Sequence, residues 1–244
     1  MPRNNNLIYR PEIQGLRALA IGLVILAHAK ISGFGGGFVG VDVFFVISGY
    51  LITQLLYCGH LATGHINFIN FLARRLLRLL PALLVMIVFV ELLAALFLSA
   101  IEFEEQTGSI LFASTWTSNL FFAFTTFDYF SELQNLDLFL HTWSLGVEEQ
   151  FYVLWPLLLM LVFSKTTQQN PHTSGILMIF SIIFAASLSL SIYWSVKNPI
   201  WSFYLMPSRV WQFSLGAMAF FLMEKLAKKK EQSSPSPFVQ RSFC

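Results

Sequence analysis

The stretch "GLRALAIGLVILAHAK", residues 15–30, has the composition of a membrane helix with two ionisable side chains inside it. Arg17 lies near its start and His28 near its end, and all the residues between them are apolar or small. Helices of about 20 mostly apolar residues cross a bilayer core. An ionisable group in such a helix is costly and usually faces a cavity or a partner. The stretch therefore predicts a transmembrane helix with a polar feature along it.

The rest of the chain repeats the apolar pattern. Of its 244 residues, 56% are hydrophobic and 11% are charged, whereas soluble domains carry about 25% charged residues. Five further hydrophobic blocks follow at residues 37–57, 71–100, 143–163, 175–194 and 203–223. We predict an all-α fold, a polytopic helical membrane bundle of about six transmembrane helices, with a membrane domain at residues 1–223. Residues 224–244 read as a basic tail of disordered composition.

The distribution of charge predicts the orientation of these helices. Lys and Arg in short loops mark the cytoplasmic side, and they occur at the N-terminus, between the second and third blocks, and in the tail. Residues 101–140 carry acids and no Lys or Arg, which places them outside. Residues 108–127 are apolar enough to count as a seventh span, but counting them would move the tail outside. We predict an interfacial or re-entrant helix there.

Arg17 and His28 are eleven residues apart, about three helical turns, so both side chains leave one face of the helix ~16 Å apart. The alternative is that Arg17 snorkels to the inner headgroups and His28 lies at the outer interface. Asp42 follows a short Gly-rich turn and can approach His28. If Asp42 accepts the Nδ1–H of His28, the Nε2 atom is left to act as a general base. The alternative for Asp42 is a helix N-cap.

Two further clusters contain charged residues at membrane boundaries. Arg74, Arg75 and Arg78 fall within about one helical turn; they are either positive-inside anchors or a site where guanidinium groups bind phosphates in a bidentate manner. Glu148 and Glu149 lie near the start of the span in "HTWSLGVEEQFYVLWP" (141–156), where adjacent side chains point ~100° apart. No CxxC or HExxH motif is present, so no metal site is predicted.

Five motifs in order resemble the membrane acyltransferase-3 family, whose bacterial members O-acetylate cell-surface carbohydrates. They are "YRPEIQGLRALAIGLVILAHA", "GGFVGVDVFFVISGYLIT", "FLARRLLRLLPAL", "HTWSLGVEEQFYVLWP" and "MPSRVWQFSLGAM". The resemblance runs from about Tyr9 to Met223. It implies an O-acyltransferase of the bacterial inner membrane, with the N-terminus and tail in the cytoplasm. The implied donor is acyl-CoA, with acetyl-CoA as the form that the resemblance favours; the resemblance implies no permanently bound cofactor and no role for nucleic acid.

The resemblance also implies roles for individual residues. His28 is similar to the family's catalytic residue, with Asp42 and Glu148 as further catalytic candidates. The implied donor-binding set is Arg17, Arg74, Arg75 and Arg78. The implied substrate-binding residues are Glu149 and Arg209.

The chain departs from the family pattern at two places. An acid usually follows the Trp of the last motif, and here the residue is Gln212. Family members normally continue with more membrane helices, so we expect a truncated or split protein, for which a downstream fragment would be a partner. The alternatives to an active acyltransferase are a catalytically inactive fragment and a membrane transporter. The lipid bilayer and a surface carbohydrate acceptor are the other expected partners.

Overall fold

The computed structural model describes residues 11–125, 137–164 and 173–233, and every regular element in these ranges is a helix. Four helical segments are long and apolar enough to cross a membrane. They correspond to α2 (Val39–Thr63), α3 (Phe68–Phe97), η1 (Leu140–Thr142) with α6 (Trp143–Ser164), and α7 (Thr173–Lys197). The all-α membrane bundle predicted from hydropathy is confirmed. The count of six spans stays a prediction, because the first and last blocks form helices outside this set of four.

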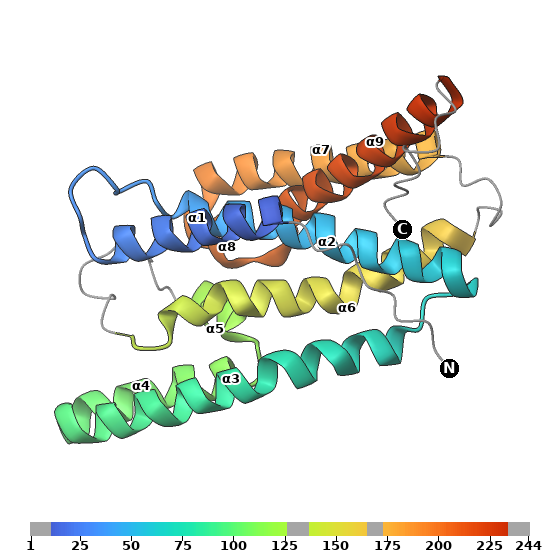
Figure 1. Cartoon of the computed structure of the whole chain (residues 1–244). Coiled ribbons are helices and arrows are strands. Elements are labelled where there is room, and N and C mark those ends of the chain that lie inside the picture. Colours follow the sequence, from blue (N-terminus) through green and yellow to red (C-terminus); the bar gives the residue numbers. More distant parts are fainter. Residues whose placement is uncertain (1–10, 126–136, 165–172, 234–244) are drawn as a thin grey trace. The chain divides into compact units, whose positions relative to one another are not determined.

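The chain divides into two compact units. The first comprises Met1–Ile66, Leu159–Ser187 and Val210–Cys244, and the second comprises Asn67–Leu158 and Leu188–Arg209. In the first unit, α1 (Pro11–His28) packs against α2, and α2 packs against α9 (Val210–Ser233) (Figure 1). Gly40, in the first turn of α2, lets α1 and α2 approach closely, because a Cβ there would overlap the carbonyl oxygen of Ala20.

The helices α2 and α9 cross at backbone contact. A Cβ on Gly49 would overlap the backbone of Phe213, and one on Gly216 would overlap the carbonyl oxygen of Val46. Small residues at such crossings let membrane helices pack without side chains between them. The rings of Phe45 and Phe213 stack beside this contact with centroids 4.9 Å apart. At this glycine crossing the backbones of α2 and α9 are therefore in direct contact.

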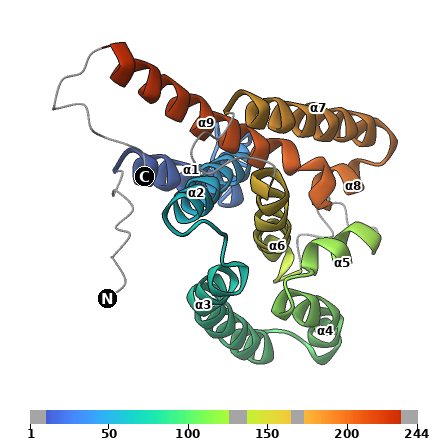
Figure 2. The same ribbon diagram turned by 90° about the vertical axis from the view of Figure 1, so that its right-hand side faces the viewer.

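In the second unit, α4 (Ala100–Ser114) turns back and runs beside α3 (Figures 1 and 2). A capping box between Ser99 and Glu102 starts α4, since each residue's side chain bonds the backbone N–H of the other. Leu83 and Ile87 of α3 form a buried cluster with Ala113 of α4 and with Phe139. The return of α4 therefore covers the middle of α3.

The described part of residues 108–127 is divided between two helices. It comprises the end of α4 and α5 (Ser118–Phe124), with a turn between them in which Trp116 has a φ of +55°. Neither α4, with 15 residues, nor α5, with 7, is long enough to cross a bilayer. This agrees with the prediction that the segment does not span, although one helix was expected and two are present.

The last hydrophobic block begins differently from the expectation. Its first residues belong to α8 (Pro199–Tyr204) and η2 (Met206–Ser208), and α9 starts only at Val210. The helix then continues to Ser233, so residues 224–233, which we assigned to the tail, are helical. Residues 234–244 lie outside the described ranges, as do residues 1–10.

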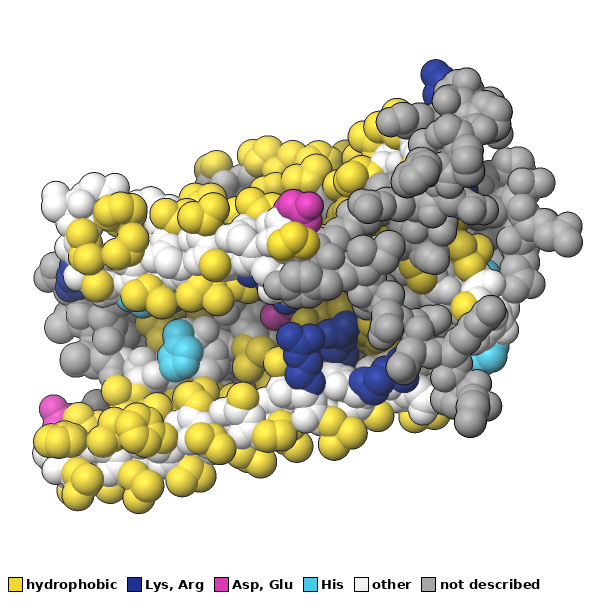
Figure 3. Space-filling view, viewed as in Figure 1, with side chains coloured by type: hydrophobic (Ala, Val, Ile, Leu, Met, Phe, Trp, Pro, Cys, Tyr) yellow, Lys and Arg dark blue, Asp and Glu magenta, His cyan; other side chains and the backbone are white. Residues whose placement is uncertain are grey.

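Helix α3 is longer than a bilayer core is thick. Its 30 residues extend ~45 Å, against a hydrocarbon thickness of ~30 Å. Large apolar side chains cover much of its exposed surface, whereas its basic side chains, all arginines, lie in its N-terminal half (Figure 3). Pro81 lies inside the helix; having no N–H, it leaves the carbonyl of Leu77 without its usual helical donor. Pro81 therefore separates the N-terminal part of α3, which carries the arginines, from the apolar part that follows.

Candidate functional site

His28 is the last residue of α1, and its side chain is exposed. Its Nδ1 lies 2.8 Å from the carbonyl oxygen of Val24. A carbonyl can only accept, so Nδ1 carries the proton and Nε2 is the basic nitrogen of the neutral ring. The ring also meets the ring of Phe38 edge-on, with centroids 5.1 Å apart. This contact favours the tautomer in which Nε2, rather than Nδ1, can accept a proton.

The structure gives the Nδ1–H of His28 a different acceptor from the predicted one, Asp42. The carbonyl of Val24 occupies the role expected of Asp42, because the Nδ1–H of His28 is donated to it. Gly40, two residues before Asp42 in α2, packs against Ala20 of α1. Ala20 precedes His28 by eight residues, or ~12 Å along the helix, so this part of α2 faces α1 well before His28.

Asp42 is bonded to α9 in the structure. Its Oδ1 accepts a hydrogen bond from Nε2 of Gln212 at 2.7 Å. The N-cap alternative is also excluded, because the N-cap of α2 is Phe38 and Asp42 lies within the first turn. A negative side chain there still favours the positive end of the helix dipole.

Arg17 lies on α1 with His28, as predicted, and it is half-buried. Its Nε is buried and has no hydrogen-bond partner among the residues that the structure describes. A guanidinium N–H without an acceptor is unusual, since Arg is rarely buried unless paired. Arg17 therefore has unused capacity to bind an anion.

The three arginines of α3 differ in their surroundings. Arg75 is half-buried, and its guanidinium lies over the rings of Phe71, at 5.5 Å, and Tyr152, at 5.6 Å. Arg74 and Arg78 are exposed; four residues apart on a helix, they are neighbours on one face. Arg75 thus stabilises the packing of α3 on α6, whereas Arg74 and Arg78 are presented outward.

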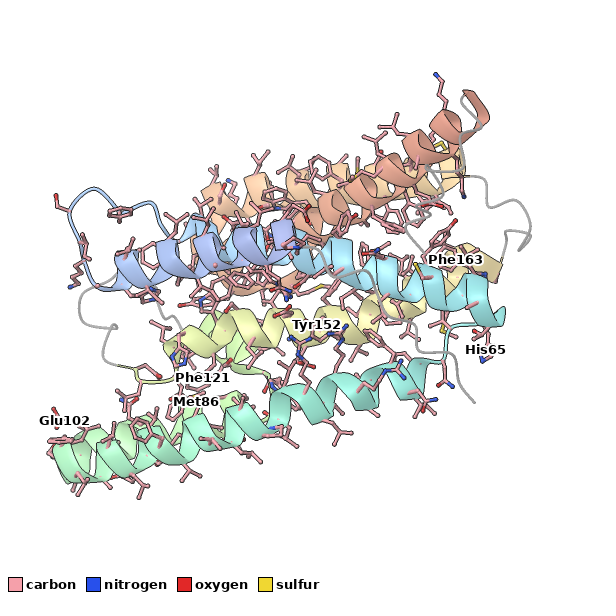
Figure 4. The ribbon with its side chains drawn as sticks, in the orientation of Figure 1. His65, Met86, Glu102, Phe121, Tyr152 and Phe163 are labelled. Atoms are coloured by element: carbon pink, nitrogen blue, oxygen red, sulfur yellow. The ribbon has the colours of Figure 1, made fainter. Side chains whose placement is uncertain are left out.

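Tyr152 connects Arg75 with the glutamate pair of α6. It extends from α6 toward α3 (Figure 4), and its hydroxyl donates to Oε1 of Glu148 at 2.5 Å. Glu149 is 6% exposed, and its Oε1 lacks a hydrogen-bond partner within the described ranges. Arg75 is near enough to interact electrostatically with Glu149. The adjacent carboxylates do have different environments, as expected from their helical spacing.

Arg209 is enclosed by aromatic rings in the second unit. Its guanidinium lies 5.0 Å from the ring centroid of Phe203 and 5.5 Å from that of Trp143, and its Nε donates to the Phe203 carbonyl at 3.0 Å. Planar guanidinium groups stack on aromatic faces in this way, and lysine cannot reproduce the contact. Arg209 is therefore rigidly held.

The predicted residues are divided between the two units. Arg17, His28 and Asp42 belong to the first unit, and the second unit holds Arg74, Arg75, Arg78, Glu148, Glu149 and Arg209.

Sequence reasoning missed the partners that hold these residues. Tyr152, which lies between Arg75 and Glu148, was not among the predicted residues. We had no role for Asn119 and Gln150, whose side-chain amides pair at 2.9 Å between α5 and α6. The presence of two side-chain amides in otherwise apolar segments was the sequence signal that could have predicted this pair.

Comparison with known proteins identifies relatives. The chain is 33% identical over 225 residues to the O-acetyltransferase OatA of Staphylococcus aureus, covering 92% of this chain and 36% of that protein. It is 41% identical over 163 residues to the peptidoglycan O-acetyltransferase OatA of Listeria monocytogenes, covering 67% of this chain and 26% of the relative. The matched part of the chain thus spans about a third of the length of the first relative and about a quarter of the second. No solved structure matches it.

The family profile for the acyltransferase domain of the acyltransferase-3 class matches residues 10–238, which include both groups of candidate residues. The chain therefore belongs to the acyltransferase-3 family.

Proposed function

We propose that this chain transfers an acetyl group from acetyl-CoA to a hydroxyl of an extracytoplasmic carbohydrate, with peptidoglycan as the first candidate. The family membership and the O-acetyltransferase names of the relatives support the reaction class. The observation that carries the proposal is the 2.8 Å contact between Nδ1 of His28 and the carbonyl oxygen of Val24, from which we infer that Nδ1 carries the proton and Nε2 is the basic atom.

In the proposed reaction, Nε2 of His28 takes the proton of the attacking hydroxyl as its oxygen bonds to the thioester carbonyl carbon. The tetrahedral intermediate collapses, the carbon–sulfur bond breaks, and the CoA thiolate leaves with the proton returned by His28. The products are an O-acetyl ester and CoA. Asp42 and Glu148 remain candidate catalytic residues, and Glu149 and Arg209 remain candidate substrate-binding residues.

The donor is proposed to bind through arginines. Arg74 and Arg78 are exposed neighbours that can take phosphate oxygens in a bidentate manner. Arg17, with its unpaired buried Nε, is a further candidate for the anionic donor. Because Arg75 already lies over two rings and near Glu149, we assign it to positioning of the glutamate pair.

Transfer from acetyl-CoA tests the proposal directly. Membranes containing the chain, together with any downstream fragment encoded beside it, should move labelled acetyl from acetyl-CoA to carbohydrate. Replacing both Arg74 and Arg78 with Lys keeps their charge and removes the planar fork. We expect the KM for acetyl-CoA to rise roughly tenfold in this double variant, the equivalent of about one lost charge-assisted hydrogen bond.

Arg75→Lys is the matched comparison. It should lower kcat more than it raises the KM for acetyl-CoA, because it removes the stacking on Tyr152 that holds α6. An unchanged donor KM in the double variant would show that Arg74 and Arg78 are only membrane anchors. Absence of transfer by the unaltered chain and its fragment would contradict the function itself.

We further propose that the protein lies in the bacterial inner membrane with its N-terminus and the end of α9 in the cytoplasm. The support is the positive-inside distribution of Lys and Arg. Reporter fusions after Gly59 and after Lys230 should be cytoplasmic, and a fusion after Glu104 should be external. A reporter after Lys230 that is found outside would contradict this topology.

A further inference from the structure

Gln212 is a fully buried amide in the first turn of α9, with 0% of its surface exposed. Its Nε2 donates to Oδ1 of Asp42 at 2.7 Å. An ionised carboxylate accepts hydrogen bonds and cannot donate them, so the nitrogen of the amide must face Asp42. With Asp42 ionised, this contact places Nε2 against the carboxylate and directs Oε1 away from Asp42.

The Oε1 atom of Gln212 is also buried, and it has no hydrogen-bond partner in the part of the chain that the structure describes. Buried polar atoms in native proteins are nearly always bonded, and the exceptions call for a ligand, a water or a functional reason. Rotation of the amide offers no relief, because it would turn Oε1 against the Asp42 carboxylate. The acceptor is therefore fixed in direction and unused.

The surroundings of Gln212 are rigid. The next residue, Phe213, contacts Gly49 through its backbone and stacks on Phe45. Gly216, one turn further along α9, contacts the Val46 backbone. An acceptor held by such a crossing loses little freedom when it binds, which is the condition for a specific hydrogen bond.

We propose that Gln212 is a substrate-binding residue whose Oε1 accepts a hydrogen bond from a neutral N–H or O–H group. The inference rests on the proposed function, which supplies two substrates with such groups. A carbohydrate carries hydroxyls, and the pantetheine arm of acyl-CoA carries amide N–H groups. A neutral amide oxygen suits these donors and does not attract phosphates.

Binding of two probes to the purified full chain tests the inference. The probes are CoA and a soluble glycan fragment of peptidoglycan, and the readouts are the thermal midpoint with and without each probe and the resulting affinity. Gln212→Met keeps the length of the side chain and removes both polar atoms. We expect about a tenfold loss of affinity for one probe and none for the other, which identifies the source of the donor group.

Two further variants separate binding from folding. Gln212→Glu should restore affinity, because a carboxyl that shares a proton with Asp42 keeps one acceptor oxygen facing the substrate. Gln54→Met replaces another buried glutamine of the same unit and should leave both affinities unchanged. If Gln212→Met is not recovered from membranes, Gln212→Asn, which withdraws Oε1 by one methylene, should show the same selective loss.

Equal binding of both probes by wild type and Gln212→Met would overturn the inference, as would a wild type that responds to neither probe. A lower midpoint without probe and unchanged affinities would mean that Gln212 only holds Asp42. The acetyl-transfer assay separates the two proposals. Transfer that is independent of Gln212 contradicts this inference alone, whereas Gln212-dependent binding without transfer contradicts the proposed function.

Discussion

Gly49→Leu should leave little folded protein, because the added side chain has no space at the crossing of α2 and α9. The atoms that a Cβ would overlap belong to the backbone of Phe213, and a backbone cannot rotate out of the way as a side chain can. Inserting atoms into a packed contact typically costs about 1–3 kcal/mol and can cost more. Leucine here must separate the two helices. We expect the variant to aggregate or to be degraded.

Gly59→Leu on the same helix is the matched control. No atom lies within 4 Å of the position that its Cβ would occupy. The measurement is the monodisperse fraction after extraction in mild detergent, followed by the thermal midpoint. Recovery of Gly49→Leu at the level of Gly59→Leu would show that α2 and α9 are not in backbone contact.

His28→Ala should abolish acetyl transfer while leaving the amount of protein in the membrane unchanged. The side chain is exposed, and its Nδ1 bonds a carbonyl of its own helix, so little packing is lost. Removal of a general base costs on the order of 10²–10⁴-fold in rate. The measurement is O-acetyl content of the surface carbohydrate against protein abundance in the same membranes.

His65→Ala is the control for loss of an imidazole. His65 is also exposed, lies in the same unit, and its Nδ1 likewise lies near a backbone carbonyl, that of Thr63, at 3.1 Å. Transfer should be unaffected in this variant. Normal acetylation by His28→Ala, in cells where wild type is active, would remove His28 from the mechanism.

Hydropathy was sufficient to predict the class of fold because lipid imposes it. Apolar segments in a bilayer must satisfy their backbone internally, and helices do so. The same rule predicts Arg17 and His28 on one helix, since both lie in a single apolar segment. The end of α9 was not predicted, because the lysines after residue 224 have a loop-like composition although they continue the helix to Ser233.

The contacts of the candidate residues depend on tertiary packing that no local pattern encodes. Asp42 and Gln212 are 170 positions apart, and either could have faced lipid or another helix. The partner of His28 is a backbone carbonyl, which every residue offers, so the sequence could not favour Val24 over Asp42. Arg75 differs from Arg74 and Arg78 only because its side of α3 meets Tyr152.

Pro81 gives α3 a second boundary marker that does not depend on charge. The Leu77 carbonyl, deprived of its donor, is a polar group that hydrocarbon cannot satisfy, and Leu77 is 76% exposed. We expect water or headgroups to reach this turn, one residue before Arg78. The remaining length from Pro81 to Phe97 is ~25 Å, close to the ~30 Å of a hydrocarbon core. The carbonyl freed by Pro81 and the arginines of α3 therefore predict the same position for the boundary between headgroups and hydrocarbon.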